Sequence, residues 1–382
     1  MFYRRLRDLR EDRDMTQRTV AEYLHIRQNT LSQYETGQRQ IPISTLIELA
    51  LFYEIVRSKD FNLSFGATLN HNKNNVDKLM EGVTASAHTG WGSTMRVPYY
   101  DYLVQVDEPV GLIQGLQSAG IYTVDDFNVE NGVWTLKAGV PDYTATSYAG
   151  GDAYNRPAGQ AAFPGMAKFA DQDNDGKITT EDVTIIGRTQ PDLTGGFNFT
   201  GNYKGLDFSA NFTYQIGGDV YNANVMHAMM GNKDTGLGQG RLKEVADCWR
   251  MYNVNAAGEL YAVTEPNELA ALNAGAKYGL PYSEYGIASS QFIEDASFLR
   301  LQTLTIGYML PKQYTKLAGI SRARIYATAG NLFCLKGYSG LDPDVNVSPS
   351  ADSSYSGFPT PSYDFRSYPK SRTFTFGLNV TF

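Results

Sequence analysis

Three aspartates alternate along one short stretch of this chain and could bind a divalent cation. They follow the spacing Asp171-x-Asp173-x-Asp175-Gly176 of an EF-hand-type loop. In such a loop alternate carboxylates supply oxygens to calcium, and the glycine permits the sharp turn. Aspartate replaces the usual glutamate at the last position, so the pattern leaves open a calcium loop, stiffened by its ion, and a solvated acidic turn. The candidate ligands are Asp171, Asp173, Asp175, the Lys177 carbonyl, Thr179 and Asp182.

Catalytic chemistry has little support elsewhere in the sequence. The 4 histidines are scattered, and neither a nucleophile motif nor a phosphate-binding loop is present. Cys248 and Cys334 lie far apart without the spacing of metal ligands, and we predict two buried free thiols. We therefore expect no enzymatic activity and no required cofactor, with Ca²⁺ in the 171–182 loop as the candidate ion.

Composition is typical of a folded protein with a bias toward aromatic residues. The chain has 382 residues, 42% of them hydrophobic, and a net charge of −7. It contains 26 Tyr and 19 Phe, a bias found in outer-membrane barrels and also in secreted all-β proteins. No apolar run approaches the ~20 residues of a membrane-spanning helix. The charged start MFYRRLRDLREDRD lacks the apolar core of a signal peptide, which predicts a cytoplasmic chain as written.

Long period-2 alternation is the main structural signal after residue 60. In residues 61–70, 206–216 and 373–382 every second residue is apolar, with polar residues between. Runs of about ten such residues suit a tilted membrane strand, apolar toward lipid and polar toward the lumen. Strands of soluble sandwiches also alternate but average about five or six residues, so strand length favours the membrane interpretation. Further strands are expected at 96–107, 194–204, 298–309 and 322–332.

The segments between these strands are long and polar. Residues 71–94, 118–192 and 218–294 are expected to form loops on one side of the membrane, because membrane barrels combine short turns at one end with long loops at the other. Within the last of them, residues 241–252 are expected to form a short helix.

The first 55 residues follow helical periodicity instead. Thr16 is a good N-cap for a helix running to Leu24, and a further helix is expected over residues 27–35, ended by Gly37. Ser44 begins another helix. This segment carries eight Arg and eight acidic residues, so its non-specific attraction to phosphates would be modest.

The stretch TQRTVAEYLHIRQNTLSQYETGQR resembles the helix-turn-helix of Cro/C1 (XRE) repressors. Ala21 corresponds to the tight helix crossing and Leu31 to a core position of that family. The resemblance implies DNA binding, with amides facing base edges, since such side chains can form bidentate bonds to adenine, and with two residues on phosphates. It also implies a candidate homodimer. The implied DNA-binding residues are Gln17, Arg27, Gln28, Asn29, Thr30, Gln33 and Arg39.

The rest of the chain resembles the C-terminal part of a SusC/RagA-type TonB-dependent outer-membrane transporter. The resemblance is carried by LNHNKNNVDKL, EPVGLIQGLQSAGIY, the long stretch from DNDGKITTEDV to QIGGDVYN, FLRLQTLTIGYMLP, GNLFCLKGYSGLDPDV and YPKSRTFTFGLNVTF. It implies import of glycans or peptides with energy from TonB, and a SusD-like lipoprotein as partner. It further implies insertion by the barrel-assembly machinery, with the terminal Phe382 as signal.

The expected fold is therefore mainly β, with two domains. Residues 1–55 are predicted to form a small all-α helix-turn-helix that lacks its last helix. Residues 56–382 are predicted to form a partial antiparallel transmembrane-type β-barrel without plug domain or TonB box. About eight strands are visible, against the roughly 22 of a plugged transporter, so transport by this chain alone is not expected. Three hypotheses remain: a truncated transporter fragment with a foreign N-terminal piece, a DNA-binding regulator with an unusual appendage, and a fusion that combines both roles.

Overall fold

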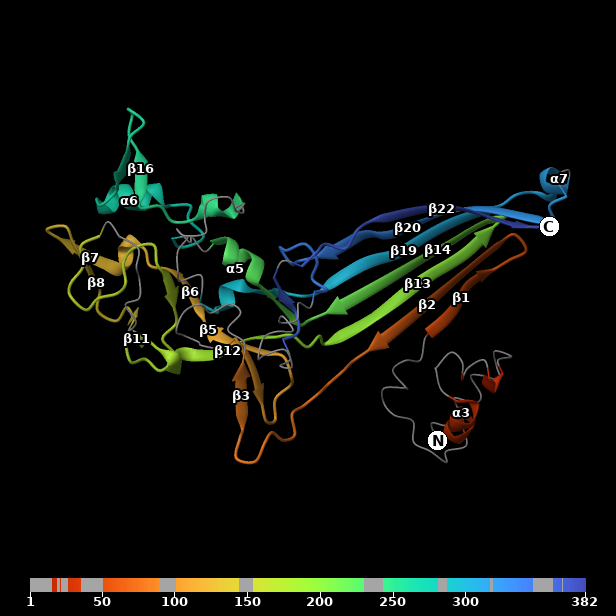
Figure 1. Ribbon diagram of the computed structural model, residues 1–382, viewed down its shortest axis with the longest axis horizontal. Helices are drawn as coiled ribbons and strands as arrows, with labels where there is room; N and C mark the ends of the chain where they lie inside the picture. Colours follow the sequence, from red (N-terminus) through yellow and green to blue (C-terminus); the bar gives the residue numbers. More distant parts are fainter. Residues whose placement is uncertain are drawn as a thin grey trace, which may run out of the picture.

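A long antiparallel sheet dominates the computed structural model (Figure 1). The structure describes residues 16–18, 21, 27–35, 51–88, 101–143, 154–229, 243–280, 287–316, 319–345, 360–365 and 367–382. The sheet has seven strands in the order β1 (Leu51–Arg57), β2 (Phe61–Asn70), β13 (Leu193–Tyr203), β14 (Leu206–Ile216), β19 (Phe298–Met309), β20 (Arg322–Lys336) and β22 (Thr373–Thr381). The mainly β fold with long alternating strands is thus confirmed.

Short connections join these strands at one end of the sheet. The turn between β13 and β14 consists of Lys204 and Gly205, whose positive φ angles of 45° and 89° match a type I′ hairpin turn. The short helix α7 (Lys312–Thr315) lies in the connection between β19 and β20 at this end (Figure 1). The long segments between strands all leave from the opposite end, as the sequence predicted.

Six of the seven predicted strands are recovered in the long sheet, whereas one is not. Residues 61–70, 194–204, 206–216, 298–309, 322–332 and 373–382 correspond to β2, β13, β14, β19, β20 and β22, of which β20 runs four residues further than predicted. Of the strand predicted at 96–107, residues 96–100 lie outside the described residues, and the described part forms β4 (Tyr102–Gln105), which belongs to a small sheet and not to the long one. The boundary predicted between residues 55 and 56 falls inside β1.

The segments that were predicted as polar loops fold into several small sheets. A four-stranded sheet has the order β12 (Val183–Arg188), β5 (Leu112–Leu116), β4 and β3 (Ala85–His88). A three-stranded sheet consists of β18 (Ile293–Asp295), β15 (Asp219–Asn222) and β21 (Tyr363–Asp364). The two-stranded pairs are β6 (Ser118–Ile121) with β10 (Ala167–Phe169), β7 (Phe127–Glu130) with β8 (Val133–Leu136), β9 (Asp142–Tyr143) with β11 (Lys177–Ile178), and β16 (Tyr252–Val254) with β17 (Leu260–Ala262).

Helices are few and short among the described residues. The α-helices are α3 (Gln28–Glu35), α5 (Ala223–Met229), α6 (Pro266–Leu272) and α7, and the 3₁₀ turns are η1 (Val124–Asp126), η2 (Thr180–Asp182), η3 (Lys243–Asp247) and η5 (Ser290–Phe292). The helix predicted within 241–252 is therefore the turn η3. No helix in the described ranges is long and apolar enough to cross a membrane.

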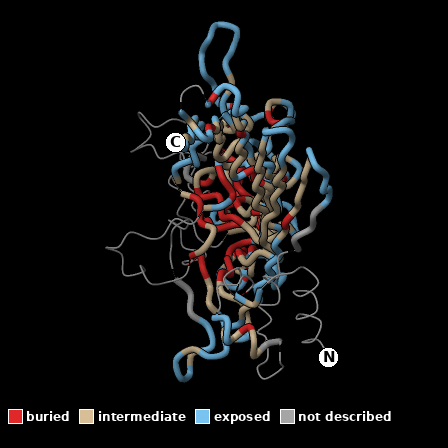
Figure 2. The backbone as a smooth tube through the Cα atoms, turned by 90° about the vertical axis from the view of Figure 1, so that its right-hand side faces the viewer, coloured by how far each residue is buried: buried red, intermediate tan, exposed pale blue. Residues whose placement is uncertain are grey.

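The hydrophobic core lies in these connecting segments. One cluster surrounds Trp134, Tyr122 and Phe163, and a second contains Tyr102, Tyr221 and Tyr363. In the view along the long axis in Figure 2, the buried positions are gathered near the centre. Cys248 belongs to the second cluster and is a buried free thiol, as predicted, whereas the free thiol of Cys334 on β20 is only half-buried.

Candidate functional site

The long sheet has one apolar and one polar face. Because the cross-strand partners are in register, side chains of one kind form rows that run across the sheet. One apolar row consists of Phe65, Phe199, Ala210, Leu304, Ala329 and Phe374. The neighbouring polar row consists of Ser64, Thr200, Ser209, Thr305, Thr328 and Thr375.

The apolar face is not covered by other described parts of the chain. Phe376 and Leu378 on β22 are 80% and 60% exposed. Phe197 and Phe212 stack with ring centroids 4.6 Å apart, but they do so along the surface of the sheet. Exposed apolar surface of this extent indicates contact with another apolar phase or with a partner. The face is therefore suited to lipid.

The polar face is held together by hydrogen bonds between side chains of neighbouring strands. The hydroxyls of Thr305 and Thr328 lie 2.9 Å apart, and the Asn211 amide donates to Thr303 Oγ1 over 3.2 Å. Nearer the short-turn end the Arg324 Nε donates to Asp207 Oδ1 over 2.9 Å, and its Nη2 contacts the second carboxylate oxygen. A side chain at Gly307 would collide with this guanidinium, so the glycine leaves room for Arg324 to reach across β19.

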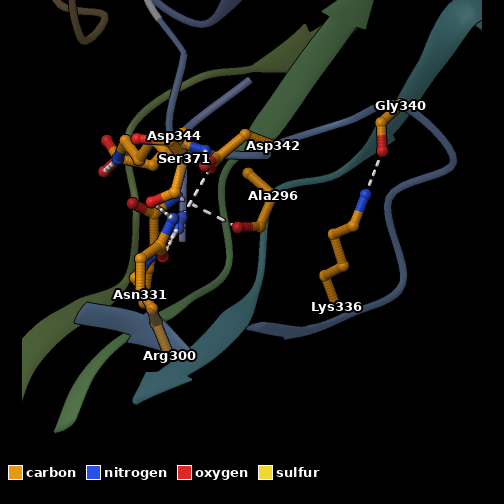
Figure 3. Close-up of polar contacts among 10 residues, drawn as sticks. Ala296, Arg300, Asn331, Lys336, Gly340, Asp342, Asp344 and Ser371 are labelled. Atoms are coloured by element: carbon orange, nitrogen blue, oxygen red, sulfur yellow. Dashed lines mark hydrogen bonds and ion pairs between the residues drawn. The ribbon is translucent and has the colours of Figure 1, made fainter. Parts of the chain in front are cut away.

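A buried ion pair lies on the polar face where the long connections begin (Figure 3). The Arg300 guanidinium donates to Asp342 Oδ1 over 2.5 Å and to Asn331 Oδ1 over 2.8 Å. Arg300 is 2% and Asp342 6% exposed, so each charge is compensated mainly by the other. Figure 3 shows that the pair joins β19 to the segment that follows β20. Lys336, the last residue of β20, donates to the Gly340 carbonyl of the same segment.

Sequence reasoning missed this ion pair. Asn331 adopts a positive φ of 54° and presents its side chain to Arg300, a conformation that asparagine tolerates better than most residues. An arginine at a polar-face position of FLRLQTLTIGYM, followed after the next strand by an acidic DPD stretch, was the available signal.

The acidic loop brings together three of its predicted ligands. Carboxylate oxygens of Asp171, Asp173 and Asp175 lie within 4.8 Å of one another. The Asp175 backbone N–H lowers the pKa of the Asp173 carboxyl, but desolvation and the neighbouring carboxylates raise it more, so the pKa of Asp173 is raised. The part of this shift that comes from the neighbouring carboxylates reflects negative charge that a cation would relieve.

The other predicted ligands have local structural roles in the same loop. Both carboxylate oxygens of the buried Asp182 accept backbone N–H groups, from Gln172 at 2.6 Å and from Thr179 at 2.7 Å. The Thr179 hydroxyl accepts the Glu181 N–H, which completes a capping box for η2. Asp182 is therefore outside the cluster of three carboxylates, and the roles of Lys177, Thr179 and Asp182 as ligands stay a prediction.

The described helix-turn-helix residues place their polar side chains at the surface. Arg27, Gln28 and Asn29 are exposed at the start of α3, while Thr30 and Gln33 are half-buried. Leu31 on the same helix is fully buried, and so is Ala21, as expected of core positions. Gln17 is helical and half-buried, and Arg39 lies outside the described residues.

Comparison with known proteins finds two kinds of relative for this chain. Residues 6–57 match the helix-turn-helix family. The cryptic phage CTXphi transcriptional repressor RstR of Vibrio cholerae is 35% identical over 68 residues, which cover 16% of this chain and 61% of that protein. The TonB-dependent receptor P3 of Formosa agariphila is 28% identical over 330 residues, covering 86% of this chain and 27% of the receptor.

The fold is also found among solved structures. The RagAB peptide importer in its closed-closed state matches with a TM-score of 0.55 and 20% identity, over 87% of this chain and 28% of the matched chain. This likeness shows the fold alone. The chain thus spans about a quarter of the length of the receptor that it matches.

Proposed function

We propose that residues 56–382 are part of the barrel wall of an outer-membrane transporter for glycans or peptides. The match of residues 6–57 to the helix-turn-helix family and the similarity of the chain to TonB-dependent receptors support this proposal. The two-faced sheet is the observation that carries the proposal. Its apolar rows would face lipid, and its hydroxyl and amide rows would line a lumen. A SusD-like lipoprotein, the barrel-assembly machinery and the transported solute are the proposed partners.

We further propose that this chain alone does not transport. Six antiparallel pairings separate β1 from β22, so these two edge strands run in the same direction. An antiparallel barrel cannot close by pairing two parallel edges, and open edges are not tolerated in lipid. Closure with antiparallel neighbours throughout therefore needs an odd number of additional strands.

Membrane fractionation followed by electrophoresis with and without heating tests the barrel proposal. A membrane-integrated sheet is expected in the outer-membrane fraction, with migration that changes on heating because the barrel resists unfolding at room temperature. A chain that is recovered as a soluble monomer would sink the proposal. Phe382, exposed at the C-terminus, is the candidate assembly signal, and Phe382→Ala is expected to reduce the outer-membrane fraction.

The alternative function is sequence-specific DNA binding, as in a transcriptional regulator. The exposed Arg27, Gln28 and Asn29 at the start of α3, above a buried Leu31, favour it. The Gln28→Ala/Asn29→Ala double variant is expected to lose binding to a selected operator, by about 1–3 kcal/mol for each bidentate contact removed. Lys59→Ala, which changes an exposed residue in the turn between β1 and β2, is the matched control. Equal gel shifts for all three proteins would argue against recognition through α3.

For the 171–182 loop we propose that Asp171, Asp173 and Asp175 bind Ca²⁺. The convergence of three carboxylates within 4.8 Å supports this proposal. The ion would stiffen the loop next to β11 and would take no part in catalysis.

A further inference from the structure

Residues 51–57 lie where the two parts of the chain meet. They continue a helical pattern in the sequence, but they form a strand in the structure. Leu46, Leu49, Ala50 and Tyr53 recur at intervals of three and four residues, so the helical periodicity that Ser44 begins continues beyond residue 50. The helix-turn-helix match accordingly runs to Arg57. In the structure, however, the same seven residues form β1 at the edge of the long sheet.

The strand form of this segment has the marks of a weak edge. Its sequence LFYEIVR lacks the clean alternation of β2, and the register with β2 shifts between Glu54 and Val56. Ile55 and Val56 are 43% and 38% exposed in the strand. In the strand form these apolar side chains are removed from water, with a favourable free energy, only if an apolar phase covers their face of the sheet.

The two forms exclude each other. Seven residues extend over about 23 Å as a strand but only about 10 Å as a helix. Moreover, the backbone N–H and C=O groups that pair β1 with β2 are the ones that a helix would use internally. A chain with β1 in the sheet therefore removes these residues from the helical domain, and a complete helical domain removes the edge strand from the sheet.

We propose that residues 51–57 are a shared segment for which the helix-turn-helix and the long sheet compete. An apolar environment on the outer face of the sheet favours the strand, and water favours the helix, in which the apolar positions can pack on the helical core. Pairing of β1 with β2 is therefore expected to make α3 less stable, and loss of this pairing is expected to make α3 more stable. The inference depends on neither transport nor DNA binding.

Locking β1 onto β2 tests the coupling in the full chain. Glu54→Cys with Ser64→Cys joins directly opposed residues, and Ser64→Cys with Thr200→Cys joins β2 to β13 as the matched control. Both pairs are made in a Cys248→Ala/Cys334→Ala background and studied in water, where the reduced protein is expected to hold residues 51–57 in the helix form. Oxidation of the first pair is expected to speed amide hydrogen exchange in residues 28–35 by roughly tenfold or more, and oxidation of the control pair is expected to leave it unchanged.

A second variant relieves the competition without cross-linking. Repeating LFYEIVR after Arg57 through a flexible linker gives each fold its own copy. In detergent micelles, where the sheet otherwise takes the segment, α3 exchange is expected to slow by a similar factor. A Gly/Ser insertion of equal length is the control and is expected to change nothing. Equal exchange in the oxidised and reduced forms of the 54–64 pair, or equal exchange in the two insertion variants, would overturn the proposal.

Discussion

The long sheet and its connecting segments are two kinds of β structure in one chain. The strands of the sheet run for up to 15 residues and expose apolar side chains such as Phe376 on one face. The connecting segments contain strands of two to six residues, and they bury aromatic side chains such as Trp134 and Tyr102 almost completely. The first kind lacks a core of its own, whereas the second resembles a water-soluble domain.

The difference indicates where each region obtains its stability. In the connecting segments the burial of apolar surface from water supplies the main favourable free energy. In the sheet the apolar face gains only from contact with lipid or a partner, and the ordered register comes from backbone pairing and from contacts such as Thr305–Thr328 on the polar face. Substitutions in the two regions should therefore respond differently to the environment.

Trp134→Ala should have the largest effect. Trp134 is 1% exposed and packs edge-on against Phe127 and Tyr154 with centroids 6.0 and 5.2 Å apart. Its truncation leaves a large cavity and is expected to cost about 3–5 kcal/mol in the free energy of unfolding of the connecting region. Limited proteolysis and near-ultraviolet circular dichroism measure the loss. Phe376→Ala, on the exposed face of β22, is the control, and an equal loss there would contradict the division into two regions.

The next effect separates the two faces of one strand. Ala329 and Thr328 are neighbours on β20, and they lie in an apolar and a polar row, respectively. Arginine on a lipid-facing position near the membrane midplane costs about 2–4 kcal/mol, whereas a lumen position tolerates it. Ala329→Arg is therefore expected to lower the yield of membrane-inserted protein and its unfolding free energy in bilayers, while Thr328→Arg is expected to change both little. The reverse order would mean that the faces are assigned the wrong way round.

Strand length explains how much of the fold could be predicted. In β14 and β22 about ten residues alternate without interruption, so the period, the face and the approximate ends follow from the sequence alone. In β10 or β16 three residues pair, which is too short for alternation to be recognised. The buried cluster around Trp134 depends on contacts between such short pieces, and for that reason the segment 118–192 was predicted as loop.

The buried ion pair gives a smaller effect at the junction of the two regions. Asp342→Asn keeps the shape of the side chain but leaves the buried Arg300 without its counter-charge. The expected loss is about 2 kcal/mol, because hydrogen bonds to charged groups contribute roughly 1.5–3 kcal/mol. Thermal unfolding measures it. Asp344→Asn, which removes a more exposed partner of Lys370, is the control and should change little. Equal losses would indicate that burial does not distinguish the two pairs.

For the candidate sites, the sequence predicted which types of residue take part, but it did not predict which side chains far apart in the chain contact one another. The alternating aspartates of the acidic loop are neighbours in the chain, and local turn geometry suffices to bring their carboxylates together. Arg300 and Asp342 are 42 residues apart, and their contact requires the strand β20 between them to be placed first. Asp182 shows the limit of the local argument, because both of its oxygens bind backbone groups of the loop.

Calcium should produce the smallest effect, confined to the connecting region. If the three carboxylates bind the ion, Ca²⁺ at a few times its Kd is expected to raise the Tm of that region by roughly 3 °C relative to a chelator. Asp173→Asn should abolish the shift. Because the pKa of Asp173 is raised, protons compete with the ion at higher pH than for an isolated aspartate, so the shift in Tm should shrink as the solution is acidified. Asp207→Asn, on the long sheet, should retain the full shift, and a shift lost equally in both variants would place the ion elsewhere.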